Sequence, residues 1–279
     1  CFSTAEHGNI FDFIMKTQNL KFGEAVKYLA NLAGMQPYMF SKKDEEREKK
    51  KKIYISIYKN YIDFYHEKFV KNNTNAKEYL KKRNLSINEV NNFKLGFVEK
   101  ESNLYTELIN KFDKKIVEDS GLFYFDEKNK KFIERFRDRL IFPINNLSGE
   151  PIALGGRIIA QNNYLAKYIN SPETEFYKKG RTIFNLDKAK DLRSVTDEVI
   201  VVEGYMDVLS LFNFGIKNVV SNSGTAITEN QINLVWKFFS NPTICLDGDD
   251  SGQKAALRVA ERLIPLINEN NKIYFSILP

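Results

Sequence analysis

The sequence predicts a mixed α+β region followed by an α/β domain with a central parallel sheet. From residue 199 onward, short apolar strands alternate with helical segments, which is typical of a parallel sheet covered by helices on both faces. Before residue 196, strand-like segments follow one another across turn-prone sequences without that alternation, which favours an α+β arrangement. A chain of 279 residues that is 43% hydrophobic can bury the cores of two such domains.

The N-terminal part is predicted to be helical. Residues 10–34 place apolar side chains at helical spacing, with an interruption near residues 17–19 and a stop at Gly34, so we expect two short helices. The next segment, residues 41–52, is almost entirely charged and lacks an apolar anchor. It is either a linker or the solvated start of a helix that continues through residues 53–71, and we expect a domain boundary there.

The middle of the chain combines helices with strands. Helices are expected at residues 76–84 and 87–93. Strands or extended segments are expected at residues 94–98, 122–126, 131–136, 140–144 and 150–159. The turn-prone sequences EKNK and NNLSG lie between strands of this set, so we expect this part of the chain to be mixed α+β.

The C-terminal part repeats a strand–helix order. Strands are expected at residues 199–203, 218–221, 243–247 and 273–278. Helices are expected at residues 206–213, 229–239 and 252–268. Polar residues follow the strand ends, and in open α/β sheets that carboxyl edge is where ligands bind.

Composition and charge exclude several classes of protein. No apolar run approaches the roughly 18–20 residues of a membrane span, no signal peptide pattern is present, and two cysteines are too few for a disulfide framework, so we expect a cytoplasmic protein.

Charge is distributed unevenly along the chain. Residues 41–100 carry 16 basic and nine acidic side chains, residues 131–195 carry 12 basic and seven acidic, and residues 196–279 carry six basic and ten acidic. A basic middle and an acidic end suit a protein that holds a phosphate backbone in one part and a divalent metal in another, although chance would give a similar distribution in a lysine-rich chain.

Carboxylates gather where two predicted strands end. Glu203 ends one strand and Asp207 follows one helical turn later, whereas Asp247, Asp249 and Asp250 end another. If these strands are adjacent, the repulsion between the charges calls for a hard cation such as Mg²⁺. The Asp-Gly-Asp-Asp segment alone is more typical of a turn and helix cap than of a metal site, and its pairing with Glu203 reverses that preference.

Basic side chains gather in the middle of the chain. Arg135, Arg137 and Arg139 stand at alternate positions, which on a strand would project from one face and suit phosphates. A solvated strand face, partly neutralised by neighbouring acids, is the alternative. Residues 167–184 mix lysines and arginine with aromatic side chains, a composition that suits single-stranded nucleic acid and also occurs in ordinary surface loops.

These motifs resemble those of a known family. The segments VVEGYMD, SNSGTAIT and CLDGDDSGQKAA are similar to the Toprim domain of bacterial DnaG-type DNA primases, and the EGYMD form with its GTA loop separates them from the Toprim domains of topoisomerases and nucleases. An RFR-type strand, a GGR turn and a KY-NSPET-KG segment occur in the family's order, and AKEYLKKRNLS resembles the opening of its catalytic domain. The resemblance covers nearly the whole chain and implies a Rossmann-like Toprim domain after a basic polymerase subdomain.

The resemblance implies roles for individual residues and segments. Glu203, Asp247 and Asp249 would bind the catalytic Mg²⁺ or Mn²⁺, two ions in all, with Asp207 as a supporting acid. The candidates for contact with template or incoming nucleotide are Arg135, Arg137, Arg139, Arg157, Lys167 and Lys179. The expected segments are a remnant of a zinc-binding domain (1–40), a charged linker (41–52), the basic subdomain of the primase catalytic core (53–195) and the Toprim domain (196–279).

Both ends of the chain are expected to be cut short relative to the family. CFSTAEHGNIFDFIM resembles the end of the primase zinc-binding domain, with Cys1 at the first position of a Cys-x2-Cys pair and Thr4 at the second. A hydroxyl is a poor zinc ligand beside a thiolate. The nitrogen of His7 could substitute for the missing cysteine. Zn²⁺ is therefore implied by the family and is not established for this chain. A further acidic motif and a helicase-interaction domain would follow Pro279. Cys245 is expected to be a small buried hydrophobe.

The activity that the resemblance implies is that of a DNA primase. This nucleotidyltransferase is a DNA-directed RNA polymerase that makes short RNA primers on single-stranded DNA from ribonucleoside triphosphates by two-metal catalysis. The implied partners are single-stranded DNA, the replicative helicase and the single-stranded DNA-binding protein at the bacterial replication fork, with no membrane. Two alternatives remain: a Toprim nuclease or topoisomerase, because the same metal site can cleave phosphodiesters, and a non-catalytic fragment that binds single-stranded DNA.

Overall fold

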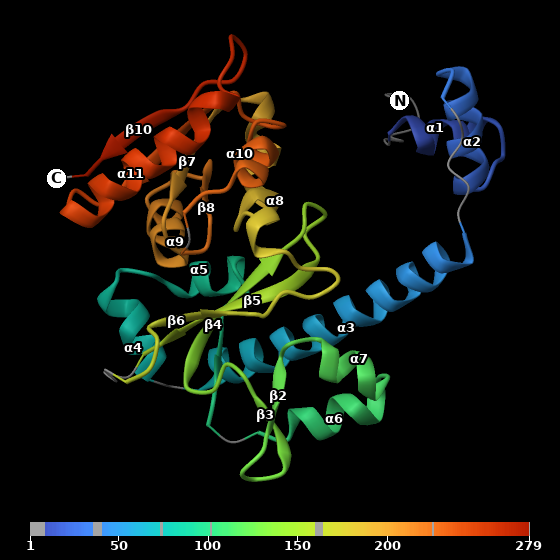
Figure 1. The fold of residues 1–279 in the computed structure, drawn as a ribbon. Coiled ribbons are helices and arrows are strands. Elements are labelled where there is room, and N and C mark those ends of the chain that lie inside the picture. Colours follow the sequence, from blue (N-terminus) through green and yellow to red (C-terminus); the bar gives the residue numbers. More distant parts are fainter. Residues whose placement is uncertain are drawn as a thin grey trace. The chain divides into compact units, whose positions relative to one another are not determined.

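A computed structural model describes residues 9–35, 41–72, 75–100, 102–159, 164–224 and 226–278. The chain forms two compact units, which comprise residues 1–50 and 51–279 (Figure 1). The boundary between them falls inside the charged segment at 41–52. No helix in the described ranges is long and apolar enough to cross a membrane.

The first unit contains the two short helices that the sequence predicts. They are α1 (Ile10–Thr17) and α2 (Phe22–Leu32). The side chain of Asn9 accepts hydrogen bonds from the amides of Phe11 and Asp12, which caps α1. Phe11 and Phe22 bring the two helices together, with ring centroids 5.7 Å apart.

The charged segment is helical. Helix α3 (Lys42–Lys71) is continuous over 30 residues, so the helical alternative for residues 42–52 is confirmed and an irregular linker there is wrong. The second half of α3 buries Tyr54, Tyr58, Tyr61 and Tyr65 at helical spacing, which anchors it to the second unit. The charged first half needs no core contact of its own, because the helix propagates from this buried half.

The middle of the second unit is built on an antiparallel sheet with the order β1-β4-β5-β6. Its strands are β1 (Gly96–Val98), β4 (Arg139–Asn145), β5 (Pro151–Ile158) and β6 (Tyr168–Asn170). A separate hairpin pairs β2 (Phe123–Asp126) with β3 (Lys131–Glu134). The helices of this part are α4 (Asn75–Lys82), α5 (Ile87–Asn92), α6 (Leu104–Lys111) and α7 (Lys114–Asp119).

The C-terminal sheet is parallel throughout, as predicted, and has the order β10-β9-β7-β8. Its strands are β7 (Glu198–Val202), β8 (Val219–Ser221), β9 (Asn241–Leu246) and β10 (Tyr274–Ile277). Its helices are α9 (Tyr205–Asn213), α10 (Glu229–Val235) and α11 (Asp250–Leu263). Helix α11 ends earlier than predicted, in the 3-10 turn η3 (Ile264–Leu266), because Pro265 has no amide hydrogen to continue it.

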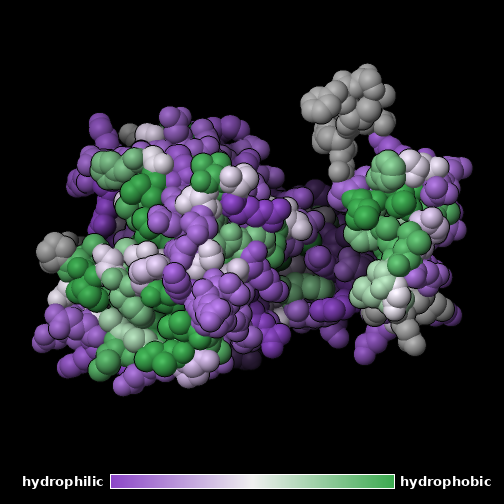
Figure 2. Space-filling view, turned by 90° about the horizontal axis from the view of Figure 1, so that it is seen from above, coloured by the Kyte–Doolittle hydropathy of each residue, from purple (hydrophilic) through white to green (hydrophobic). Residues whose placement is uncertain are grey.

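Both faces of this sheet are covered, which is why its strands read as continuous apolar runs. On β7, Val199 and Val201 pack into the core beneath α10 and α11, whereas Val202 packs with α9 into the core that contains the antiparallel sheet. Hydrophobic cores therefore continue from the middle of the chain into the C-terminal sheet. On the surface, hydrophobic patches lie among hydrophilic areas (Figure 2), and β10 exposes Tyr274, Phe275 and Ile277.

The segment that joins the two sheets consists of short helical turns. These are η1 (Lys179–Arg181), α8 (Leu186–Ala189) and η2 (Lys190–Ser194). Between η1 and α8, Phe184 exchanges two main-chain hydrogen bonds with Ser221 of β8, at 2.8 and 3.1 Å. The connection is therefore fixed to the edge of the parallel sheet.

The arginine-rich segment corrects one prediction. Residues 135–138 form a turn, and β4 begins at Arg139, so Arg135, Arg137 and Arg139 do not project from one face of a strand. The reason is local: Asp138 adopts a left-handed conformation (φ 57°), which aspartate tolerates better than most residues. Because the chain reverses there, the alternate spacing of the arginines no longer sets their direction.

Candidate active site

Two carboxylates meet at the carboxyl edge of the parallel sheet. Glu203 directly follows β7 and Asp247 directly follows β9, and these two strands pair. The amide of Asp247 donates a hydrogen bond to Oε1 of Glu203 over 3.4 Å. The sequence prediction that two strands bring their acids to one edge is confirmed.

Two glycines lie next to these acids. Gly204 is the N-cap of α9, and its amide donates to Oδ2 of Asp207 over 3.0 Å. A Cβ on Gly252 would lie 2.0 Å from the carbonyl oxygen of Asp247, so no other residue fits at that position. The close approach holds the start of α11 against the end of β9.

Asp249 contributes to the fold and also belongs to the acidic edge, the group of carboxylates of Glu203, Asp207, Asp247 and Asp249 at the carboxyl ends of the parallel strands. It is the N-cap of α11, and Oδ1 accepts a hydrogen bond from the amide of Gly252 over 2.7 Å. The helix-cap reading of the Asp-Gly-Asp-Asp segment is therefore confirmed. The cap leaves Oδ2 of Asp249 for other partners.

Burial and the neighbouring acids raise the pKa of Glu203 and of Asp207. Burial, followed by the charges of Asp247, Asp207 and Asp249, raises the pKa of Glu203, although the amide of Asp247 opposes this. Burial and the charge of Asp247 raise the pKa of Asp207, against the amide of Gly204 and the guanidinium groups of Arg83 and Arg157. Such mutual repulsion is relieved when a cation binds.

The donor set fits a hard divalent cation. Within the described ranges, no three His, Cys, Asp or Glu side chains already converge as a metal site. The side chains of Glu203, Asp207, Asp247 and Asp249 are nevertheless exposed oxygen donors at one sheet edge, which is the ligand chemistry of Mg²⁺ and Mn²⁺.

The loop after β8 supports the main chain of Glu203. The hydroxyl of Ser221 and the amide of Gly224 both donate to the carbonyl oxygen of Glu203 over 3.0 Å. A cavity of about 400 Å³ lies beside this loop, and its lining includes Glu203, Asn222 and Cys245. Cys245 is half-buried, so it is less enclosed than the sequence predicts.

Of the basic residues that the sequence predicts for the site, Arg157 is the one whose charge acts on the acids. Its guanidinium carbon lies 5.0 Å from the ring centroid of Tyr79 and 4.9 Å from that of Tyr168, and it also donates a hydrogen bond to the hydroxyl of Tyr168. It is 7% exposed, and its charge opposes the rise in the pKa of Asp207. The two rings and the hydroxyl of Tyr168 hold the guanidinium group in an enclosed position.

Tyr205, which lies two residues after Glu203 of the acidic edge, packs against the antiparallel sheet. Its ring is stacked on Phe142 of β4, with centroids 5.1 Å apart, and its hydroxyl donates to Oδ1 of Asn170. A Cβ on Gly155 would lie 2.3 Å from that ring, so the first glycine of the GGR motif is required by this packing. The EGYMD and GGR motifs are therefore in direct contact.

The three arginines of the RFRDR segment have separate surroundings. Arg135 donates from Nε to the carbonyl oxygen of Gly121 over 2.8 Å, and Arg137 donates to the hydroxyl of Tyr124 over 3.1 Å. Arg139 is 5% exposed and donates to two main-chain carbonyl oxygens. Among the contacts of the described residues, none of the three touches the acidic edge, and the enclosed position of Arg139 favours a structural role.

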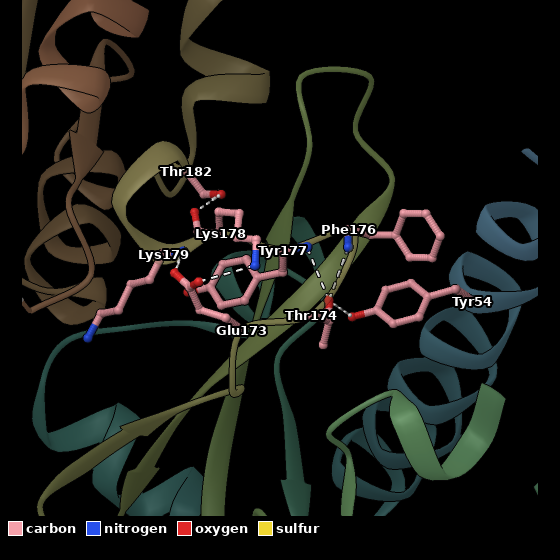
Figure 3. Close-up of polar contacts among 8 residues, drawn as sticks. All are labelled: Tyr54, Glu173, Thr174, Phe176, Tyr177, Lys178, Lys179 and Thr182. Atoms are coloured by element: carbon pink, nitrogen blue, oxygen red, sulfur yellow. Dashed lines mark hydrogen bonds and ion pairs between the residues drawn. The ribbon is translucent and has the colours of Figure 1, made fainter. Parts of the chain in front are cut away.

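Lys167 and Lys179 remain available for ligands. Neither ammonium group has a hydrogen-bond or ion-pair partner among the residues that the structure describes. Lys167 is exposed in the loop before β6. Burial lowers the pKa of Lys179, whose side chain extends from the turn η1 away from Glu173 (Figure 3).

Tyr79 and Arg83 are site residues that the sequence reasoning missed. Arg83 lies over the ring of Tyr79 at 5.4 Å, and its charge acts on Asp207. Their i, i+4 spacing would have placed the two on one helix face. Cys1, Thr4 and His7, the residues of the zinc question, lie outside the described residues.

Family models match three parts of the chain. They are the CHC2 zinc finger over residues 1–46, the N-terminal domain of the DNA primase catalytic core over residues 64–190, and the Toprim domain over residues 197–276. The first and last are families of metal-binding modules, which agrees with the coarse prediction of metal binding.

Curated relatives and solved structures agree with these matches. The DNA primase of Clostridium acetobutylicum is 36% identical over 92% of this chain and 43% of its own length, and that of Haemophilus influenzae is 33% identical over 100% and 48%. The chain thus spans slightly less than half of these relatives. A DNA primase domain from Pseudomonas aeruginosa matches with a TM-score of 0.73 and 34% identity, covering 81% of this chain and 71% of that one. A DnaG primase catalytic domain described as bound to ssDNA matches with a TM-score of 0.75 and 29% identity, covering 83% and 73%.

Proposed function

The chain belongs to the bacterial DnaG-type DNA primase family, and from that premise we propose that it carries out nucleotidyl transfer in RNA primer synthesis on a single-stranded DNA template. One observation supports this most directly: Arg157, which lies over the rings of two tyrosines, is near enough to Asp207 at the edge of the parallel sheet for its charge to act on that carboxylate. A polymerase needs a phosphate-binding cation and metal-binding acids within one substrate's reach.

The carboxylates have the role of metal ligands in this proposal. Glu203, Asp247 and Asp249 would hold two Mg²⁺ or Mn²⁺ ions, with Asp207 in support. Such ions stabilise the negative charge that develops on the transferred phosphoryl group and the leaving pyrophosphate. The chain's own contribution is orientation, because the amides of Asp247 and Gly252 fix one oxygen of Glu203 and of Asp249.

The basic residues have the role of substrate ligands. Arg157 would contact the phosphate backbone while the rings of Tyr79 and Tyr168 keep its plane fixed. Lys167 and Lys179, whose ammonium groups have no partner within the described part of the chain, would contact template and incoming triphosphate. Arg135 and Arg137 remain candidates for the template path, held near Tyr124.

The substrates would be ribonucleoside triphosphates and single-stranded DNA. The solved neighbour described as bound to ssDNA supports the second of these. For the whole protein we propose the bacterial replication fork as the place of action, with the replicative helicase and the single-stranded DNA-binding protein as partners and a nucleotidyltransferase of the primase type as the enzyme class. Zn²⁺ binding through Cys1 also remains a proposal, supported by the zinc-finger family match.

Substitution of Asp247 tests the proposed function in the natural full-length protein. Asp247→Ala should abolish template-dependent incorporation of labelled ribonucleotides and leave the affinity for single-stranded DNA within about twofold, because the acid contributes no phosphate contact. Asp191→Ala, which removes an exposed carboxylate from η2, is the control and should stay active. Incorporation by Asp247→Ala would contradict the proposal, and metal-dependent cleavage of labelled DNA by the unsubstituted protein without nucleotides would favour the nuclease alternative.

A further inference from the structure

The turn that carries Lys179 is held on one side by the segment before it. Oε1 of Glu173 accepts a hydrogen bond from the amide of Lys179 over 3.1 Å, and Oε2 lies 3.3 Å from Nζ of Lys178 (Figure 3). Oγ1 of Thr174 accepts hydrogen bonds from the amides of Phe176 and Tyr177. It also lies 3.0 Å from the hydroxyl of Tyr54 on α3. The antiparallel part of the fold thus fixes the start of the turn.

The same turn is held on its other side by α10 of the parallel sheet. Nε2 of Gln231 donates to the carbonyl oxygens of Lys179, over 3.0 Å, and of Thr182, over 2.9 Å. The hydroxyl of Thr228 donates to the carbonyl oxygen of Gly180 over 2.6 Å. One amide group therefore spans both ends of η1.

Gln231 is fully enclosed, and both ends of its amide group are used. It is 0% exposed, and Oε1 accepts a hydrogen bond from the amide of Thr228 over 3.0 Å. A buried amide that is completely satisfied holds its partners rigidly, because each lost bond would leave a polar group without water. The N-cap of α10 does not require the two bonds to η1, since the hydroxyl of Thr228 and Oε1 of Gln231 form that cap between them.

The framework continues from the turn to the metal-binding edge. Phe184, two residues after Thr182, exchanges two main-chain hydrogen bonds with Ser221. The hydroxyl of Ser221 donates to the carbonyl oxygen of Glu203. The backbone that carries Lys179 and the backbone that carries Glu203 are thus joined by a short series of hydrogen bonds.

We infer that Gln231 is a positioning residue that sets the place of Lys179 relative to the carboxylates at Glu203 and Asp247. The inference rests on the proposed function, in which Lys179 contacts the triphosphate of the incoming nucleotide. Gln231 itself touches no substrate. It acts by holding η1, so that the unpartnered ammonium group reaches the phosphates that the acidic edge also binds.

The test uses Gln231→Met in the natural full-length protein, which keeps the side-chain length and removes both donors to η1 together with the acceptor for the amide of Thr228. The KM for ribonucleoside triphosphates should rise about tenfold, while kcat and the affinity for single-stranded DNA change by less than about twofold. Gln231→Glu keeps an acceptor for Thr228 and loses the donors, so it should act in the same direction. Asn218→Leu removes another amide that donates to a main-chain carbonyl, at the opposite end of β7, and should leave KM unchanged.

A double substitution separates positioning from general damage. Lys179→Met alone should raise the same KM, and adding Gln231→Met should then change it little, because the two residues act as one unit. Independent effects that multiply, or an unchanged KM in Gln231→Met, would overturn the inference. If the wild type itself incorporates no ribonucleotide, the proposed function fails instead.

Thermal unfolding checks that each variant folds. Direct binding of a fluorescently labelled ATP measures its affinity for nucleotide. If Gln231→Met does not fold, Gln231→Glu carries the same test, because it keeps an acceptor for the amide of Thr228 and loses both donors to η1. A weaker affinity for labelled ATP with an unchanged melting temperature supports the inference, and an unchanged affinity contradicts it.

Discussion

The amide of Asp247 donates a hydrogen bond to Oε1 of Glu203, although 44 residues separate them. The bond joins the ends of β7 and β9 and fixes the direction of one carboxylate oxygen. The other oxygen of Glu203 stays available for a ligand. Because the charge of Asp247 raises the pKa of Glu203 at the same time, the pair is held together against its own repulsion, which is the arrangement that a divalent cation stabilises.

Asp249 should have separable roles in stability and in catalysis. Asp249→Ala removes the N-cap of α11 and should cost about 1 kcal/mol of unfolding free energy. Asp249→Asn keeps a capping oxygen and removes the charge, so it should retain stability and lose ribonucleotide incorporation. Chemical denaturation and an incorporation assay on both variants check this. If Asp249→Asn remains active, the residue only caps the helix.

Gly155→Ala should destabilise the second unit. A Cβ at this position would lie 2.3 Å from the buried ring of Tyr205, and such overpacking costs typically about 1–3 kcal/mol. Thermal unfolding measures the loss. In a chain that already carries Tyr205→Leu, the further cost of Gly155→Ala should be smaller, since the clashing ring is absent. Gly23→Ala is the control, because nothing lies within 4 Å of its new Cβ. An equal cost of Gly155→Ala with and without the ring would exclude this contact as the cause.

The acidic edge could be predicted from the sequence because its determinants are local. Apolar runs define β7 and β9, and each carboxylate follows its strand directly, so a parallel arrangement alone brings Glu203 and Asp247 together. The resemblance to a primase Toprim domain supplied the family, which the comparisons confirm.

The arrangement of the basic residues could be predicted only in part, because it depends on contacts between residues that are distant in sequence. Arg157 meets Tyr79 across 78 positions, and no periodic pattern encodes that contact. The expectation that Arg135, Arg137 and Arg139 share one strand face fails at a single left-handed residue, Asp138, whose conformation is not visible in the alternation of arginines. Side-chain chemistry was therefore predictable where strand ends set direction, and not where tertiary packing sets it.

Arg157 should contribute to nucleic-acid binding through its shape as well as its charge. Arg157→Met should weaken the affinity for single-stranded DNA by about tenfold and reduce its salt dependence. Arg157→Lys keeps the charge and loses the planar group between Tyr79 and Tyr168, so it should restore the salt dependence and only part of the affinity. Lys237→Met removes an exposed charge on the surface of the parallel-sheet part and is the control. Full affinity in Arg157→Lys would show that charge alone matters.

Glu134 should make the stability of the second unit depend on pH. It is 5% exposed, and both Tyr65 and Tyr61 donate hydrogen bonds to Oε2. Burial raises the pKa of Glu134 above its usual value despite these bonds. Between the unfolded and the folded pKa the native state holds more protons than the unfolded state, so its stability falls as pH rises through that interval. In Glu134→Gln the side chain cannot ionise and keeps an acceptor for Tyr65. The unfolding free energy of this variant should therefore increase relative to that of the wild type as pH increases. Urea denaturation of both proteins at intervals between about pH 5 and pH 8 measures this difference, and a difference that stays constant with pH would contradict a raised pKa at Glu134.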